Sequence, residues 1–78
     1  MTASENKKVA IAAKLTEVTR ILDCIKQQLS RIDKIAEELE KILSEEEQRE
    51  ITNRLYWFTY HLEHEISDFE ETVKNLMN

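Results

Sequence analysis

The stretch Leu43-Ser44-Glu45-Glu46-Glu47 lies near the middle of this 78-residue chain and predicts where the backbone turns. Ser44 followed three residues later by Glu47 is the pattern of a capping box, in which each side chain bonds the backbone N–H of the other residue. Consecutive glutamates suit the first turn of a helix, because the free N–H groups there carry partial positive charge. We therefore expect one helix to end near residue 43 and a second to begin near residue 45.

Apolar residues before this turn recur at alternating spacings of four and three without interruption. They are Ile11, Leu15, Val18, Leu22, Ile25, Leu29, Ile32, Ala36, Leu39 and Leu43. This spacing is typical of a helix that packs lengthwise against another helix. It predicts one helix over about residues 4–43.

The apolar residues after the turn predict a second helix over about residues 45–76. They are Ile51, Leu55, Phe58, Leu62, Ile66, Phe69, Val73 and Leu76. Two consecutive spacings of four around Leu62 interrupt the heptad pattern and would locally unwind a supercoil. When the second helix is folded back on the first, apolar layers pair so that their residue numbers add to 87 or 88. The sequence therefore predicts an all-α, coiled-coil-like antiparallel hairpin, with residues 1–78 as one domain.

The composition excludes most other classes of protein. The chain has no glycine and no proline, so it lacks the turn formers of small β folds and the glycine-rich loops that bind phosphate. Its single cysteine, Cys24, excludes a disulfide framework, and charged residues at 35% argue against a membrane span. We expect a cytoplasmic protein, because the N-terminus has no signal-peptide pattern and an unpaired cysteine fits a reducing compartment.

The apolar residues listed above form the seam, the row along which the two helices are predicted to pack. The helices also carry apolar and aromatic residues beyond this seam. Seven of these are predicted to bind a partner: Ile21, Ile35 and Ile42 in the first helix, and Tyr56, Trp57, Tyr60 and His64 in the second. Two explanations remain open. These residues form the core of a dimeric four-helix bundle, or the aromatic residues form a docking site for a different protein.

Charge is distributed unevenly along the chain, whose formal net charge is -5. Residues 1–43 contain 8 basic and 7 acidic side chains, whereas residues 44–78 contain 3 basic and 9 acidic ones. The segment between Arg54 and Lys74 has no lysine or arginine and would repel a nucleic-acid backbone. A basic protein partner is one candidate for this acidic half, and a solvated helix face is the other.

Catalytic and metal-binding chemistry finds little support in the sequence. His61 and His64 stand near acidic residues, but the first helix has no histidine, and the paired Glu-x-x-His elements of di-iron bundles are absent. Cys24 has no visible partners for nucleophilic catalysis. We therefore expect no enzymatic activity, no cofactor and no bound metal.

The segment Leu43-Ser44-Glu45-Glu46-Glu47-Gln48-Arg49-Glu50-Ile51 resembles the turn of Rop, a helical hairpin that dimerises into a four-helix bundle and binds RNA. The resemblance covers nine residues and implies RNA binding as one alternative function. RNA would need a basic face, and Arg20, Arg31, Lys34 and Lys41 are interrupted by glutamates on the outer side of the first helix.

These observations favour a non-enzymatic protein–protein interaction module. We expect a small hairpin that self-associates, as a homodimer, or that acts as an adaptor or chaperone for an amphipathic helix of a partner protein. The Rop-like RNA-binding bundle is the first alternative. An acidic inhibitor that mimics nucleic acid through residues 63–71 is the second.

Overall fold

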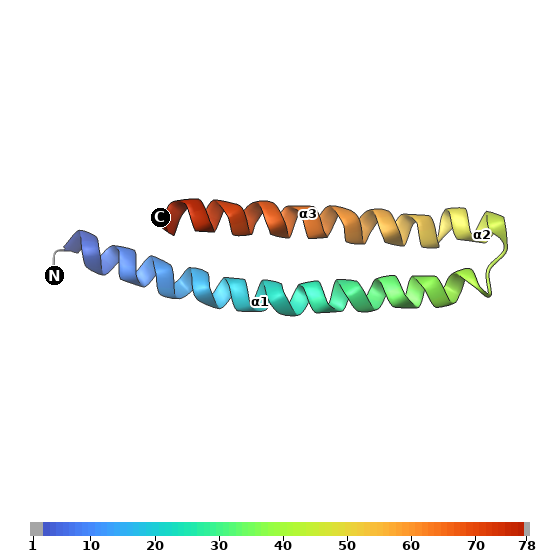
Figure 1. The fold of residues 1–78 in the computed structure, drawn as a ribbon, viewed down its shortest axis with the longest axis horizontal. Coiled ribbons are helices and arrows are strands. Elements are labelled where there is room, and N and C mark those ends of the chain that lie inside the picture. Colours follow the sequence, from blue (N-terminus) through green and yellow to red (C-terminus); the bar gives the residue numbers. More distant parts are fainter. Residues whose placement is uncertain (1–2, 78) are drawn as a thin grey trace.

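The computed structural model describes residues 3–77, and every regular element in that range is a helix. Helix α1 runs Ala3–Glu40, α2 runs Glu45–Glu50 and α3 runs Thr52–Met77. Helices α2 and α3 follow one another almost in line and form one arm, which lies antiparallel beside α1 (Figure 1). The expected all-helical fold is confirmed, and its two arms form a hairpin 63 Å long.

In the turn between the two arms, no residue adopts the left-handed backbone conformation with positive φ. Helix α1 ends at Glu40, three residues before the expected end, and its last turn tightens through bonds such as Ile42 N–H to the Leu39 carbonyl at 2.9 Å. The side-chain amide of Gln48 donates to the carbonyls of Glu40 at 2.9 Å and Leu43 at 3.1 Å. Since no residue in 3–77 has a positive φ, Gln48 performs the carbonyl capping for which many helices use glycine.

The expected capping box begins the second arm. Ser44 is extended, with φ -70° and ψ 166°, and its hydroxyl accepts from Glu47 N–H at 3.2 Å. The Ser44 N–H donates in return to Glu47 Oε1 at 2.9 Å. These bonds favour the ionised carboxylate and hold the pKa of Glu47 below its ordinary value.

The second arm is interrupted at Ile51, where a single continuous helix was expected. Ile51 has φ -107° and ψ -64°, and it separates α2 from α3. At the next residue, the hydroxyl of Thr52 donates to the Gln48 carbonyl at 2.8 Å. Thr16, Thr19 and Thr72 form the same kind of bond within uninterrupted helices, so this bond alone does not explain the break.

The buried row of the second arm differs from the one expected. Ile51 and Phe58 were assigned to the seam, but they are 44% and 53% exposed, whereas Thr52 and Thr59 are 0% and 2% exposed. Thr52, Thr59 and Ile66 follow one another at intervals of seven residues, so the irregularity expected around Leu62 is absent. Threonine fits this row because its hydroxyl bonds within the protein and its methyl group packs.

The most buried part of the hairpin lies between the middle and the turn. Ala36 and Leu29 of α1 are 0% and 3% exposed, like the two threonines of α3. Ala36 and Leu29 lie seven residues apart, as do Thr52 and Thr59, which is the spacing of successive layers between two packed helices. The expected register, in which paired residue numbers add to 87 or 88, stays a prediction.

Side-chain bonds that join α1 to α3 include one hydrogen bond and one ion pair between charged or polar side chains. Thr59 Oγ1 lies 2.7 Å from Asp33 Oδ1, and Lys26 Nζ lies 2.6 Å from Glu70 Oε1. In the expected register, the two Cα atoms of each bond lie at different levels along the hairpin, at least one helical turn apart. The side chains bridge this offset because each tilts toward the N-terminus of its own helix, and the two helices are antiparallel. The bond to Glu70 raises the pKa of Lys26.

Candidate interaction surfaces

Helix α1 presents a polar edge and an apolar edge beside its buried row. Lys26 and Asp33, three residues before and four after Leu29, lie along one edge. Ile25 and Ile32, four before and three after Leu29, lie along the other. Because Lys26 and Asp33 both bond to α3, their edge turns toward one side of the hairpin and the isoleucines toward the opposite side.

Helix α3 has the same two edges around Ile66. Glu70 lies four residues after Ile66 and bonds Lys26, so it marks the same side of the hairpin as the polar edge of α1. Leu62 and Phe69, four before and three after Ile66, face the opposite side. The hairpin therefore has a polar side, on which Lys26 and Glu70 meet, and an apolar face behind it.

The apolar face combines residues of both arms that remain exposed. They are Ile11, Val18, Ile21, Ile25, Ile35 and Ile42 from the first arm, and Ile51, Phe58, Phe69 and Leu76 from the second, with exposed fractions of 38–80%. The predicted partner-binding residues Ile21 and Ile35 of α1, and Ile42 of the turn, form its outer margin on the first arm. Ile51 and Phe58 join it because the threonines occupy the buried row.

An aromatic cluster of Trp57, Tyr60, His61 and His64 lies on the outer surface of α3. The Trp57 and His61 rings stack with centroids 4.7 Å apart and planes at 22°, and the Tyr60 and His64 centroids are 4.4 Å apart. Trp57 meets Tyr60 edge to face at 6.1 Å. The predicted grouping of Trp57, Tyr60 and His64 is thus observed. His61 was not predicted to belong to it, although its spacing of four from Trp57 indicates a shared face.

Tyr56 turns from this cluster toward α1. It lines a shallow hollow of about 370 Å³ with Trp57 and Tyr60. Burial raises the pKa of the Tyr56 hydroxyl, and a hydrogen bond to the Glu40 carboxylate raises it further. The hollow therefore opens on the polar side, next to the C-terminal end of α1.

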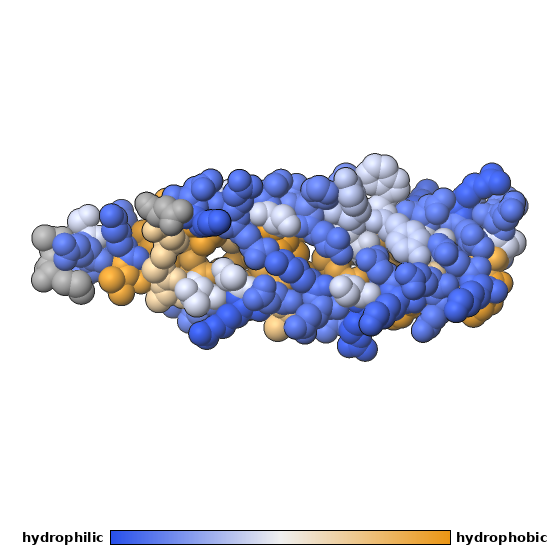
Figure 2. All heavy atoms as spheres, viewed as in Figure 1, coloured by the Kyte–Doolittle hydropathy of each residue, from blue (hydrophilic) through white to orange (hydrophobic). Residues whose placement is uncertain are grey.

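The structure separates the predicted partner-binding residues into two surfaces. Tyr56, Trp57, Tyr60 and His64 lie toward the polar side and the outer surface of α3, whereas the three isoleucines lie on the apolar face. Figure 2 shows a largely hydrophilic surface on this side of the hairpin, with orange residues toward the open end, between the arms and near the turn. Ile21, Ile35 and Ile42 therefore do not form one continuous surface with the aromatic residues.

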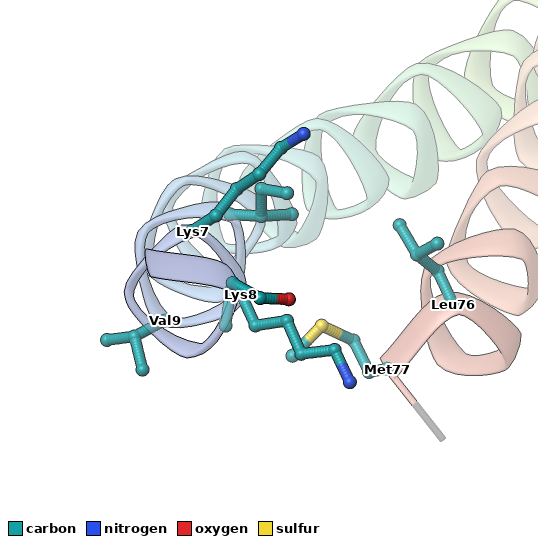
Figure 3. A pocket seen from close by; sticks show the side chains of 8 residues that line it. Lys7, Lys8, Val9, Leu76 and Met77 are labelled. Carbon is teal, nitrogen blue, oxygen red and sulfur yellow. The ribbon is translucent and has the colours of Figure 1, made fainter. Parts of the chain in front are cut away.

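A cleft of about 540 Å³ lies at the open end of the hairpin. It is lined by Ser4, Lys7, Lys8, Val9, Ile11, Ala12, Leu76 and Met77. In Figure 3, Met77 extends toward α1 beside Lys8, and Val9 points away from α3. Through Ile11 and Leu76 the apolar face continues to this end of the molecule.

The described residues carry few groups suited to chemistry. Between residues 3 and 77, no set of three histidine, cysteine or acidic side chains is placed to hold a metal ion. Cys24 is a free, exposed thiol. None of the helices in this range has the length and apolar character needed to cross a bilayer.

Comparisons of the chain with protein-family models, curated proteins and solved structures found no match. The hairpin itself offers two candidate surfaces, the apolar face and the aromatic side with its hollow.

Proposed function

We propose that this protein is a non-enzymatic protein–protein interaction module that pairs with a second copy of itself through the apolar face. The observation that carries the proposal is the exposure of ten large apolar side chains along one face of the hairpin. An exposed apolar patch of this extent typically marks a contact surface.

The small interior of the single hairpin supports this proposal. Within residues 3–77, the buried apolar side chains are Leu29, Ala36 and Ile66 alone. Burial of a leucine or isoleucine side chain stabilises a fold by roughly 1.5–3 kcal/mol. Two such residues and one alanine therefore offset little of the entropy lost by two long helices. Chains of this size usually gain the missing stability through disulfides, metals or association.

A second copy fits the apolar face by shape. Two antiparallel helices present a nearly flat layer, and stacking two such layers by a two-fold axis produces a four-helix bundle. Phe58 and Phe69 would then enter the core with Ile21, Ile35 and Ile42. The same packing can accept one amphipathic helix of a partner protein, which would make the hairpin an adaptor or a chaperone for that helix.

We place this activity in the cytoplasm, also as a proposal. Its support is the free thiol of Cys24, which is exposed on α1 and would persist in a reducing compartment.

Paired charge substitutions test the role of the apolar face. Ile35→Lys with Phe58→Lys should convert a dimer into a monomer, as measured by light scattering during size exclusion. Gln27→Lys with Ser67→Lys adds the same charge at exposed positions outside the apolar face and should leave the dimer intact. If both double variants have the mass of the unaltered chain, the apolar face is not the interface. Salt-sensitive RNA binding that is lost in Arg31→Glu would instead support the Rop-like alternative.

A further inference from the structure

Three carboxylates of the polar side gather near the C-terminal end of α1. Asp33, Glu37 and Glu40 follow at helical spacings of four and three, so they share one face. All three act on the neighbouring Tyr56 hydroxyl, and their negative charge contributes to its raised pKa. Asp33 approaches α3 most closely, through its bond to Thr59.

These carboxylates have no basic partner among residues 3–77. The ion pairs of that range join Lys14 with Glu17, and Lys26 with Asp23 and Glu70. The last turn of α1 also contains no basic residue, although the carbonyl end of a helix carries partial negative charge of its own. Negative potential at this corner of the hairpin is therefore reinforced by the carbonyl end of the helix.

Tyr56 joins this negative corner to the other aromatic rings of α3. Trp57 and Tyr60 are 61% and 55% exposed, and together with Tyr56 they line the shallow hollow. The faces of tryptophan and tyrosine rings attract cations, most strongly arginine and lysine side chains. Beyond Arg54, α3 has no lysine or arginine before Lys74.

We infer that this corner binds an arginine or lysine side chain from a basic segment of a partner protein. We call it the cation hollow, formed by Asp33, Glu37, Glu40, Tyr56, Trp57 and Tyr60. Arginine suits it best, because a guanidinium group can stack on a ring while its N–H groups bond carboxylates. The inference rests on the proposed function as an interaction module, but it uses the side of the hairpin opposite the apolar face.

The unaltered chain provides its own reporter for this site. Trp57 is the only tryptophan, so its fluorescence reports on the cation hollow alone. The probe is a synthetic helical peptide with arginines along one face. It should change Trp57 emission in a saturable and salt-sensitive manner. A lysine version should bind more weakly, and a version with glutamine in place of arginine should not bind.

Matched variants distinguish binding at the cation hollow from nonspecific attraction of a basic peptide to an acidic protein. Glu37→Gln with Glu40→Gln should weaken binding of the arginine peptide about tenfold, since an exposed ion pair contributes up to about 1 kcal/mol. Asp68→Asn with Glu71→Gln removes the same charge from elsewhere on α3 and should change affinity less than about twofold. Tyr60→Leu keeps the reporter and should weaken binding roughly threefold through loss of a cation–π contact.

Equal losses in the two double variants, or no saturable binding by a folded chain, would overturn the inference. Helical content by circular dichroism shows that each variant is folded, and sedimentation shows its oligomeric state. A monomer that binds the peptide with the expected variant pattern would support the cation hollow and contradict the proposed dimer. A dimer that fails to bind would contradict the cation hollow alone.

Discussion

The Thr59 hydroxyl of α3 bonds the Asp33 carboxylate of α1 at 2.7 Å, at a position where Thr59 is only 2% exposed. The same hydroxyl lies 3.1 Å from the Tyr56 carbonyl oxygen. A hydroxyl has one proton to donate, and the closer, charged acceptor is Asp33. This bond fixes the two arms relative to each other near the centre of the hairpin.

Thr59→Val should therefore destabilise the fold although valine has nearly the same shape. The variant removes the donor and leaves a half-buried carboxylate with fewer partners, at a cost of about 1–2 kcal/mol. Urea unfolding at fixed protein concentration measures the change. Thr16→Val, in which an exposed hydroxyl bonds only within its own helix, should cost much less. A Thr59→Val variant as stable as the unaltered chain would contradict this account.

Ala36→Leu should destabilise the hairpin by overpacking. Ala36 is 0% exposed, so a larger side chain would force the arms apart, at about 1–3 kcal/mol. Ala13→Leu is the control, because Ala13 is exposed on the same helix. Thermal unfolding followed by circular dichroism compares the two. If Ala36→Leu melts at or above the temperature of the control, the arms do not approach closely at Ala36.

Ser44→Ala should weaken the start of the second arm. It removes the hydroxyl that accepts from Glu47 N–H, and loss of such a cap typically costs about 1 kcal/mol. Ser44→Asp retains a cap and should recover most of the loss. Ser67→Ala, within α3, should have no destabilising effect, since alanine favours a helix interior. If urea unfolding gives Ser44→Ala and Ser67→Ala the same free energy of unfolding, the capping box does not contribute to stability.

The capping box also predicts a dependence of stability on pH. The pKa of Glu47 in the folded chain lies below its ordinary value of 4.5, so folding favours the ionised form. Its contribution is fully present above about pH 4.5 and is lost as the pH falls through the lower, folded pKa. Glu47→Gln keeps an acceptor but cannot titrate.

Glu47→Gln should accordingly lose less stability than the unaltered chain between about pH 5 and pH 3. Chemical unfolding at each pH gives the two curves. Glu46→Gln removes a charge from the same helical turn without removing a capping bond, and it serves as the control. Parallel curves for Glu47→Gln and the unaltered chain would rule out the capping carboxylate as a source of acid sensitivity.

Much of the fold could be predicted from the spacing of residues. The uninterrupted heptads of α1 and the Ser44 capping box indicate two long helices and the place where the chain turns. The buried row of α3 could not be read in this way, because Thr52 and Thr59 look polar. Their hydroxyls are bonded to Gln48 and Asp33, so only their methyl groups pack against α1, and hydropathy alone misses them.

The candidate surfaces were predicted only in part, again because the buried row of α3 is not apparent from hydropathy. Spacing alone places Trp57, Tyr60 and His64 on one face of a helix. Spacing could not show that these residues and Ile21 lie on different sides of the hairpin. That depends on how each arm is rotated about its own axis, and the rotation depends on which residues fill the buried row. Once the threonines occupy that row, Phe58 turns to the apolar face and Tyr56 turns toward Glu40.

Association through the apolar face is the central claim, and sedimentation equilibrium of the unaltered chain tests it most directly. The account predicts a dimer with twice the chain mass of 9.3 kDa. It also predicts that Trp57 emission remains typical of water exposure in that dimer, because Trp57 lies outside the apolar face. A stable mass of 9.3 kDa across the accessible concentrations would contradict the account.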